Sequence, residues 1–385
     1  MHRYQYLIIG GGVAADSALK GIRMSEPNAK IGLVSDELDR PYNRPPLSKS
    51  LWDGMPILEI WRPNRGDQVT MHLGRRVVHL DPVRRLARDQ LGEIYAFDKA
   101  LLAVGGSPRR LEGNDEGVVY FRTLGDYKRL RALTVESEAI TLVGAGLIGS
   151  ELAACLRKAG SAVDLYCGPR GVLRSLLPEV LSNELTRTLV EHGVRVHYKR
   201  VQSINKNGGH HLRMSDGEVV HARRVVAGLG LLPNIELAAT AGIACEDGIR
   251  VDASLMTSQP GIYAAGDCVS YWCSALDRRV QSQHEEHANF SGVAAGRAMT
   301  GKAVQYAALP YFYSRILNHA FEGIGQIDSK LLHHIHAPRG PSEATVYYLE
   351  AGRIVGVLSF NVRADLERAT ELIESKKIFT RSDLI

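Results

Sequence analysis

Two parts of the chain show the same order of hydrophobic and polar positions. In each, a short apolar run is followed by a glycine-rich turn, then by apolar residues at helical spacing, then by a second apolar run. In order, these stretches lie at 6–9, 10–12, 16–24 and 31–34 in the first part, and at 140–143, 144–149, 150–159 and 162–166 in the second. Each part predicts a strand–helix–strand unit of about 30 residues.

The small residues of the two turns have the spacing of a dinucleotide-binding turn. In such a turn the first glycine permits a tight bend, the second lets the backbone approach a pyrophosphate, and the third small residue allows the helix to pack closely on the strand. These positions are occupied by Gly10, Gly12 and Ala15 in the first turn, and by Gly144, Gly146 and Gly149 in the second. Because the phosphate binds at the helix N-terminus, we expect two nucleotide sites.

One acidic residue distinguishes the two units. Asp36 follows the second strand of the first unit, where a carboxylate can accept hydrogen bonds from ribose hydroxyls; an acid in a surface turn is the alternative. The matching strand of the second unit ends without an acid and is followed by Arg170 and Arg174. Basic residues there tolerate a 2′-phosphate, so NADPH is expected to be accepted, unless both arginines are only solvated.

Length and composition limit the class of protein. At 385 residues, the chain is expected to form about two to three domains. Hydrophobic residues make up 45% and charged residues 23%, which is usual for a globular protein and argues against a disordered chain. The 38 glycines follow no collagen period, and they indicate many tight turns or close approaches of backbone to ligand.

Charge and cysteine content bear on partners and location. The formal net charge of +5 is dispersed, so we expect no nucleic-acid-binding stripe. The excess would favour an acidic protein or an anionic cofactor as partner, and a solvated surface of mixed charge is the alternative. Five cysteines do not suit a disulfide framework, which favours a reducing, cytoplasmic location. No apolar run is long enough for a membrane span, and the first strand begins too close to Met1 for a signal peptide.

Four further segments carry a family resemblance, namely Tyr42–Lys49, Leu102–Arg109, Val225–Asn234 and Ile262–Asp267. Together with the two glycine turns they resemble the FAD-dependent pyridine nucleotide-disulfide oxidoreductase superfamily. The branch they resemble contains the oxygenase-coupled ferredoxin reductases and the apoptosis-inducing factors. Two smaller matches, Gly292–Gly301 and Phe321–Ser329, are more similar to the apoptosis-inducing factors.

The resemblance implies an α/β fold with two Rossmann-like, three-layer dinucleotide-binding domains of the glutathione-reductase type and a smaller α+β C-terminal domain. It implies a discontinuous FAD-binding domain (1–110 and 235–302), an inserted NAD(P)H-binding domain (111–234) and a C-terminal domain (303–385). For the last of these, the residues themselves predict strands at 345–348 and 354–360 with a turn between them, and a helix over 364–375.

The resemblance also implies the residues of two cofactor sites. The FAD contacts it implies are Gly10, Gly12, Val13, Ala14, Ala15, Asp36, Arg44, Lys49, Val77, Arg109, Gly266, Asp267, His284 and Tyr313. The NAD(P)H contacts it implies are Gly144, Gly146, Leu147, Ile148, Gly149, Glu151, Arg170, Arg174, Gly230 and Glu322.

Four of these residues, Lys49, Glu151, His284 and Tyr313, are expected to act in catalysis. By the resemblance, Lys49 lies near the flavin ring and pairs with Glu151, so that its ammonium stabilises the charge a flavin gains on reduction; a surface lysine is the alternative. His284 lies at the start of a helix whose N-terminus points at the flavin. Tyr313 stands where the family usually has Trp, and Arg315 reverses the charge of the usual Asp.

Thiol and metal chemistry are not expected. Residues 42–49 lack the cysteines that disulfide reductases of the superfamily carry there, and Cys268 and Cys273, although spaced as CxxxxC, follow the wrong motif. The two histidines of His284–His287 are three residues apart, whereas a helical zinc motif needs four. The three histidines within 333–336 alternate between the faces of an expected strand.

These features predict an FAD-dependent NAD(P)H oxidoreductase, a monomer or homodimer, in which the nicotinamide gives a hydride to flavin N5 and electrons leave toward an external acceptor. The first hypothesis for that acceptor is a ferredoxin- or rubredoxin-type protein. The second is an apoptosis-inducing-factor-like NAD(P)H oxidase or diaphorase with a quinone, ferric or oxygen acceptor and redox-controlled dimerisation or partner binding. A third is a flavin-binding scaffold without catalysis.

Overall fold

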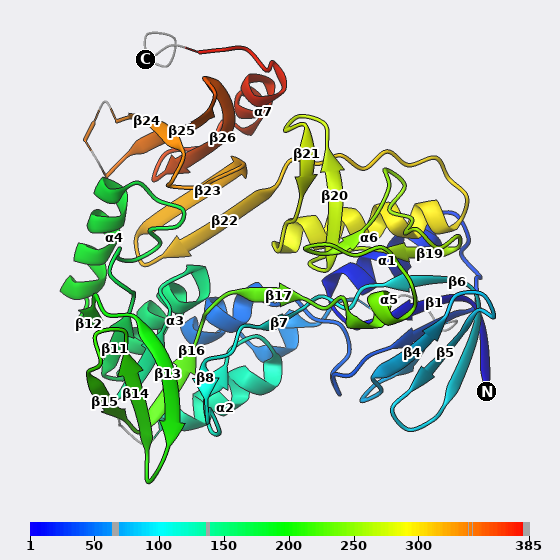
Figure 1. Cartoon of the computed structure of the whole chain (residues 1–385), viewed down its shortest axis with the longest axis horizontal. Helices are drawn as coiled ribbons and strands as arrows, with labels where there is room; N and C mark the ends of the chain where they lie inside the picture. The colour runs from blue at the N-terminus through cyan, green and yellow to red at the C-terminus, as the bar shows by residue number, and fades with distance from the viewer. Residues whose placement is uncertain (64–68, 136–138, 338, 341, 380–385) are drawn as a thin grey trace. The chain divides into compact units, whose positions relative to one another are not determined.

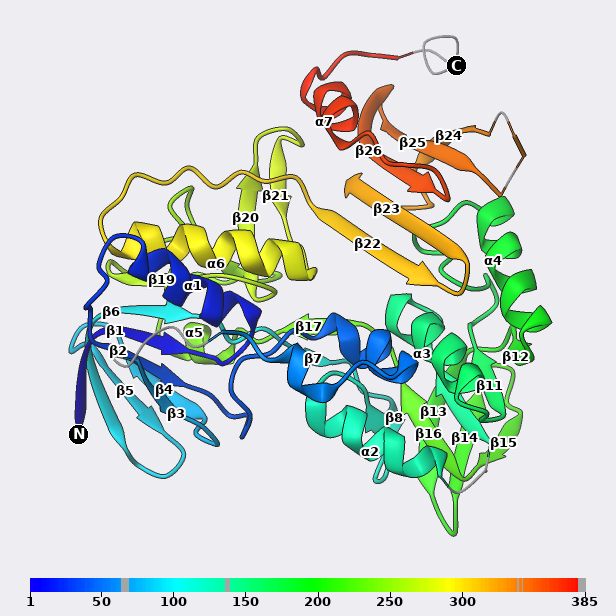
Figure 2. The same cartoon turned by 180° about the vertical axis from the view of Figure 1, so that it is seen from behind.

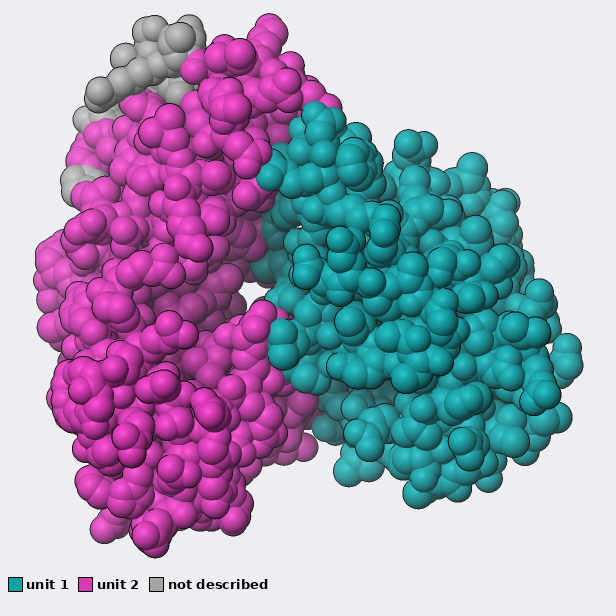
Figure 3. All heavy atoms as spheres, viewed as in Figure 1, with its two compact units in different colours: residues 1–43, 57–107, 232–311 teal, residues 44–56, 108–231, 312–385 magenta. Residues whose placement is uncertain are grey.

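The protein is described from a computed structural model that covers residues 1–63, 69–135, 139–337, 339–340 and 342–379 (Figure 1). The chain forms two compact units, coloured separately in Figure 3. Unit 1 contains residues 1–43, 57–107 and 232–311, and unit 2 contains residues 44–56, 108–231 and 312–385. Each unit is described by itself.

Unit 1 is built on a seven-stranded sheet in the order β3-β2-β1-β6-β5-β4, with β19 also paired to β6. Its strands are β1 (His2–Ile9), β2 (Ile31–Val34), β3 (Val69–His72), β4 (Val77–Asp81), β5 (Leu86–Asp89), β6 (Ile94–Leu102) and β19 (Ile262–Ala264). The pairings among β3, β2, β1, β6 and β19 are parallel. The apolar run at 6–9 is buried, as parallel strands covered on both faces require.

Helices α1 (Val13–Arg23) and α6 (Glu285–Met299) lie side by side against this sheet (Figures 1 and 2). Glycines allow this close approach. A Cβ on Gly292 would lie 2.4 Å from Ala14 O, one on Gly296 would lie 2.2 Å from Ala18 O, and one on Gly21 would lie 2.3 Å from Val293 O. The glycines in both helices therefore set the distance between them.

The remaining elements of unit 1 are short. They are the 3-10 helix η3 (Ile57–Ile60), helix α5 (Glu236–Thr240), and the three-stranded arrangement β18-β20-β21, formed by β18 (Ile249–Arg250), β20 (Val269–Cys273) and β21 (Arg278–Val280). Two further strands, β7 (Gly106–Pro108) and β17 (Leu231–Pro233), pair with each other where the chain passes from one unit to the other.

Unit 2 contains the second nucleotide-type sheet, in the order β12-β11-β10-β16-β9. Its elements are β9 (Val119–Tyr120), α2 (Leu124–Thr134), β10 (Ile140–Val143), α3 (Leu147–Lys158), β11 (Val163–Tyr166), α4 (Glu179–Glu191), β12 (Val194–His197) and β16 (Arg224–Ala227). A further sheet of unit 2 has four strands in the order β15-β14-β13-β8. They are β8 (Glu112–Gly113), β13 (Val201–Lys206), β14 (His210–Met214) and β15 (Val219–Ala222), so strands that are consecutive in the chain are neighbours in the sheet.

Residues 44–56 leave the fold of unit 1 and pack in unit 2, as the 3-10 helices η1 (Pro45–Ser48) and η2 (Ser50–Asp53). The Trp52 ring meets Tyr127 of α2 edge-on at 5.6 Å, and Tyr127 Oη donates to the carbonyl oxygen of Leu51 at 3.3 Å. Lys158 of α3 forms an ion pair with Asp53 at 2.5 Å. This segment is therefore anchored on two helices of unit 2.

The C-terminal part of unit 2 is a five-stranded sheet in the order β22-β23-β26-β25-β24, with helix α7. Its elements are β22 (Tyr311–Ile316), β23 (His319–Gly325), β24 (Leu332–His336), β25 (Ala344–Glu350), β26 (Arg353–Phe360) and α7 (Leu366–Glu374). The strands and the helix expected in this region are present, and the helix is shorter than predicted.

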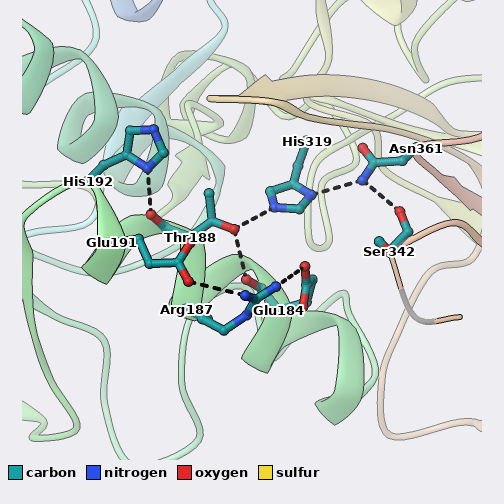
Figure 4. A network of polar contacts seen from close by, with 8 residues as sticks. All are labelled: Glu184, Arg187, Thr188, Glu191, His192, His319, Ser342 and Asn361. Carbon is teal, nitrogen blue, oxygen red and sulfur yellow. Dashed lines mark hydrogen bonds and ion pairs between the residues drawn. The ribbon is translucent and has the colours of Figure 1, made fainter.

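A polar network joins this sheet to helix α4 (Figure 4). The buried ring of His319 contacts Thr188 Oγ1 through Nε2 at 2.8 Å and Asn361 Nδ2 through Nδ1 at 2.9 Å. Asn361 Nδ2 also donates to the carbonyl oxygen of Ser342 at 2.8 Å, and Thr188 Oγ1 donates to the carbonyl oxygen of Glu184 at 3.2 Å. Two of these hydrogen bonds, both made by His319, therefore connect Thr188 of α4 with Asn361 directly after β26.

The predicted α/β class is confirmed, and both strand–turn–helix units form where the pattern places them. The helix expected through residue 159 ends at Lys158. By compactness the chain forms two units rather than three, so the three-domain division stays a prediction. In the part of the chain that the structure describes, no helix is both long and apolar enough to span a membrane.

Candidate functional site

The turn between β1 and α1 forms the first expected nucleotide-binding turn. Gly10 has φ +120°, and a Cβ there would lie 2.1 Å from the carbonyl oxygen of Ala103, so only glycine fits. Gly12 is the N-cap of α1, whose first residues are Val13, Ala14 and Ala15, and no side chain caps its N–H groups. These N–H groups are donors that an anion can use.

The second expected flavin motif lies beside this turn within unit 1. Gly266, just after β19, has φ +81°, and a Cβ there would lie 2.8 Å from the Cβ of Ala14. Asp267 follows and is half-buried. The structure thus brings two motifs together that are some 250 residues apart in sequence.

The other expected FAD residues of unit 1 are Asp36, Val77 and His284. Asp36 is exposed directly after β2, and Val77 is buried at the start of β4. His284 is the N-cap of α6: its Nδ1 accepts the N–H of Glu286 at 3.3 Å, and its ring meets Tyr311 edge-on at 5.8 Å. His284 therefore caps the helix whose N-terminus was expected to point at the flavin.

Four expected FAD residues belong to unit 2 instead, namely Arg44, Lys49, Arg109 and Tyr313. Arg44 is half-buried and donates to the carbonyl oxygen of Arg122 at 3.1 Å. Arg109 is exposed, and its backbone N–H donates to the carbonyl oxygen of Gly230 at 2.9 Å. Tyr313 is exposed on β22.

The turn between β10 and α3 repeats the geometry of the first. Gly144 has φ +98° and would place a Cβ 2.5 Å from Gly228 O, and a Cβ on Gly149 would lie 1.9 Å from Gly144 O. A Cβ on Gly146, in contrast, would meet nothing within 4 Å. Gly146 is the N-cap of α3, again without a side-chain cap, and Leu147 and Ile148 follow it. The open space lies where a pyrophosphate is expected.

The remaining expected NAD(P)H residues differ in their surroundings. Arg170 is exposed, whereas Arg174 donates to the carbonyl oxygen of Leu177 at 2.8 Å and lies 3.8 Å from Glu179. Gly230 has φ +87° and open space at its Cβ. Glu322 is half-buried on β23. The guanidinium of Arg174 therefore has protein partners, and the expected role of either arginine at a 2′-phosphate stays a prediction.

Lys49 and Glu151 meet in unit 2. Lys49 Nζ lies 2.7 Å from Glu151 Oε1, and the Glu151 side chain is only 3% exposed whereas that of Lys49 is 26% exposed. Two hydroxyls complete the surroundings of the carboxylate: Ser48 Oγ donates to Oε2 and Ser314 Oγ donates to Oε1, both at 2.5 Å. The pairing expected from the resemblance is present, and the catalytic roles of both residues stay predictions.

Sequence analysis did not identify Ser48 and Ser314 as part of this cluster. Ser48 precedes Lys49 and Ser314 follows Tyr313, so each serine is adjacent to a residue that the sequence predicts to be catalytic. Neither contact follows from spacing, because η1, α3 and β22 are distant in sequence. Alternation along β22 points Ser314 inward and leaves Tyr313 and Arg315 exposed.

The cysteines and histidines do not form a further reactive site in the described residues. None of the five cysteines, all of which lie in described residues, forms a disulfide, and burial raises the pKa of the Cys268 thiol to about 12, so it is not a thiolate at neutral pH. Cys273 is buried as well. Within residues that the structure describes, no group of three or more His, Cys, Asp and Glu side chains could hold a metal ion.

A comparison of helix starts tests whether the chain suits two dinucleotides. Helices α2, α6 and α7 are capped by the side chains of Thr123, His284 and Asp365. Helices α1, α3, α4 and α5 lack such a cap, and of these only α1 and α3 begin at glycines, whereas α4 and α5 begin at Pro178 and Ile235. Helix starts with a glycine in place of a capping side chain fit the phosphates of FAD and of NAD(P)H, and at Gly146 the Cβ position is also open.

Comparison with known proteins identifies similar chains. A family model described as pyridine nucleotide-disulphide oxidoreductase matches residues 4–290. Rhodocoxin reductase of Rhodococcus erythropolis is 30% identical over 387 residues, which cover 97% of this chain and 90% of that protein. The mitochondrial apoptosis-inducing factor 1 of Dictyostelium discoideum is 28% identical over 424 residues, which cover 98% of this chain and 79% of that protein.

Solved structures show the same likeness. A crystal structure of the covalent putidaredoxin reductase–putidaredoxin complex contains a chain that superposes with a TM-score of 0.89 at 25% identity. The match covers 99% of this chain and 95% of that one.

Proposed function

The chain belongs to the pyridine nucleotide-disulphide oxidoreductase family, and on that basis we propose that it is an FAD-dependent enzyme that oxidises NAD(P)H and passes the electrons to a small ferredoxin- or rubredoxin-type protein. The observation that carries the proposal is the pair of uncapped glycine turns before α1 and α3, since each suits one dinucleotide. The names of relatives support the acceptor, because a ferredoxin–NAD(P)+ reductase and a rubredoxin–NAD+ reductase are each 29% identical to this chain.

Each part of the chemistry is assigned to residues of this chain. When bound, FAD supplies the acceptor for the nicotinamide hydride and the means of releasing electrons. The N–H groups at the start of α1 would hold its pyrophosphate, with Asp267 on the ribityl side. The N–H groups at the start of α3 would hold the pyrophosphate of NAD(P)H. Lys49 would supply positive charge toward the flavin, and Glu151 would hold the lysine in place.

A supporting point concerns location. None of the five cysteines, all in the part of the chain that the structure describes, forms a disulfide. Cysteines outside disulfides suit a reducing compartment, so we place the protein in the cytoplasm as part of the same proposal.

Anaerobic stopped-flow reduction with NADH and with NADPH tests the proposal. We expect loss of flavin absorbance with at least one nucleotide, and reduction by NADPH if Arg170 accepts a 2′-phosphate. No bleaching with either nucleotide would refute the enzyme and favour a scaffold without catalysis.

The variant Gly146→Ala tests the second turn directly. The backbone of Gly146 has φ −74°, and its Cβ position is open, so the variant should fold normally. The methyl group would fill the space expected for the pyrophosphate and raise the Kd for NAD(P)H at least tenfold, about 1.4 kcal/mol. Gly209→Ala, also at a site with room for a Cβ, is the matched control and should leave the Kd unchanged.

A second candidate function is that of an apoptosis-inducing-factor-like oxidase or diaphorase, in which the nucleotide-bound state controls dimerisation or partner binding. The similarity to the Dictyostelium protein and the Phe321–Ser329 match favour it. Sedimentation before and after anaerobic addition of NADH distinguishes the candidates. A reversible change of mass with slow reoxidation in air supports the second, and an unchanged mass with rapid reoxidation refutes it.

A further inference from the structure

Three buried aromatic rings of unit 1 pack together, and one of them contacts Gly266. They belong to Tyr271 of β20, His287 of α6 and Tyr306 of the segment after α6. The His287 ring stacks on Tyr271 with centroids 5.1 Å apart and an interplanar angle of 14°. His287 Nδ1 lies 2.8 Å from Tyr306 Oη. The histidine is thus fixed by stacking on one side and by a hydrogen bond on the other.

Both backbone polar groups of Gly266 are bound by side chains of α6. The N–H of Gly266 donates to Ser291 Oγ at 3.0 Å, and its carbonyl oxygen lies 3.3 Å from His287 Nε2. Ser291 Oγ in turn donates to the carbonyl oxygen of His287 at 2.6 Å. Gly266 has a positive φ and no room for a side chain, and its carbonyl oxygen also accepts the N–H of Val269 at 3.1 Å, so two side chains of α6 and one backbone hydrogen bond hold it.

The hydrogen bonds determine the state of the imidazole. A carbonyl oxygen only accepts, so Nε2 must carry the proton, and Nδ1 then accepts the hydroxyl proton of Tyr306. Burial lowers the pKa of His287 to about 4, although nearby Asp267 acts in the opposite direction and His284 acts in the same direction. At neutral pH the ring is therefore uncharged and present as one tautomer.

We propose that His287 and Ser291 are positioning residues of the flavin site, which hold Gly266 and thereby aim the Asp267 carboxylate at the ribityl and pyrophosphate end of FAD. This inference rests on the proposed function, because it assumes that FAD binds at the two motifs of unit 1. A purely packing role would not need an imidazole, since a phenyl ring could stack on Tyr271 equally well but could not donate to Gly266.

The test uses the full-length protein with its FAD removed and then restored, and measures the FAD Kd by quenching of flavin fluorescence. His287→Phe keeps the ring and loses both hydrogen bonds, so we expect the Kd to rise at least tenfold. His287→Gln can still donate to the carbonyl of Gly266, so we expect a rise of less than about threefold. Ser291→Ala removes the partner of the Gly266 N–H, and we expect a rise of roughly threefold to tenfold.

A second measurement does not require FAD to be bound. Amide hydrogen exchange of residues 266–268 in the FAD-free protein should be faster in His287→Phe and Ser291→Ala than in the wild type, because the turn has lost a tether. The matched control is His319→Phe in unit 2, where an equally buried histidine with two hydrogen-bonded nitrogens lies against Phe360. It should change neither the FAD Kd nor this exchange.

The outcomes separate the inference from the function on which it rests. A wild-type protein that does not bind FAD refutes the proposed function and the inference with it. If the wild type binds FAD and His287→Phe binds it equally well with unchanged exchange, the inference alone is overturned. An equal loss in His319→Phe also overturns it, because the effect would then be general destabilisation. Should His287→Phe not fold, unchanged behaviour of Ser291→Ala decides against it.

Discussion

At the scale of single residues, the Glu151 carboxylate of α3 binds side chains from two other segments of unit 2. Ser48 and Lys49 come from η1 and the residue after it, and Ser314 comes from β22. A buried charge is costly unless it is paired and hydrogen-bonded. The carboxylate at 3% exposure therefore depends on the ammonium, and the partly exposed ammonium is held in one place by the carboxylate.

The variant Lys49→Ala should retain FAD but slow flavin reduction by NAD(P)H at least tenfold, about 1.4 kcal/mol of barrier, because positive charge expected near the flavin is lost. Stopped-flow reduction at saturating nucleotide measures this rate. The variant should also unfold at a lower temperature, since the buried Glu151 carboxylate loses the cation that pairs with it.

Two further variants separate charge from stability in this prediction. Lys49→Ala combined with Glu151→Gln removes the unpaired charge and should recover the melting temperature without recovering the rate. Lys158→Ala breaks the exposed ion pair with Asp53, which also joins α3 to residues 44–56, and should leave the rate unchanged. A normal reduction rate in Lys49→Ala would remove this lysine from the catalytic residues.

At the scale of elements, β22 and β23 are held at two places. Ser314 on β22 binds Glu151 of α3, and His319 at the start of β23 binds Thr188 of α4 (Figure 4). Asn361 donates to Nδ1 of His319, so Nε2 carries the only ring proton and the network requires a neutral imidazole. Desolvation lowers the pKa of His319, with Glu184 opposing this shift and Arg187 adding to it.

The sign of the pH effect follows from this lowered pKa. As the pH falls below about 6.5, His319 binds a proton at a higher pH in the unfolded chain than in the folded chain. The stabilisation of the folded protein by the neutral His319 is therefore complete above that pH and is lost as the pH falls. His319→Gln should be less stable than the wild type by about 1 kcal/mol at pH 8, and the difference should shrink at pH 5. Urea unfolding at both pH values measures it, with exposed His221→Gln as the control; a difference independent of pH would contradict the prediction.

The elements that could be predicted from the sequence are those that depend on interactions between residues close together in the chain. Gly10 and Gly144 require positive φ, and the apolar runs before them form buried parallel strands, so both turns could be found from spacing alone. The packing of residues 44–56 with α2 and α3 could not be predicted, because it depends on contacts such as that of Trp52 with Tyr127. From the sequence, His287 is only one of two histidines that lack the spacing of a helical zinc motif. Its hydrogen-bond partner Gly266 lies close to it only in the folded chain.

At the scale of the whole molecule, the net charge of +5 is expected to affect how fast the proposed acceptor associates with the protein. The excess of 47 basic over 42 acidic residues is too dispersed to mark a site. It can still raise the rate at which an acidic electron carrier meets the protein, because summed charge steers diffusional encounter over distances of about a Debye length. Such steering affects association and not the reduction of the flavin.

The last prediction therefore compares two steps under changing ionic strength. Reduction of cytochrome c through an added acidic [2Fe–2S] ferredoxin should show a kcat/KM that falls several-fold between about 0.05 and 0.3 M NaCl, as steering is screened. Reduction of an uncharged quinone at the same NAD(P)H concentration should change much less, because it shares the hydride step but involves no charged acceptor. Equal salt dependence of both activities would assign the effect to nucleotide binding, and no salt dependence of the ferredoxin reaction would argue against a charge-steered carrier.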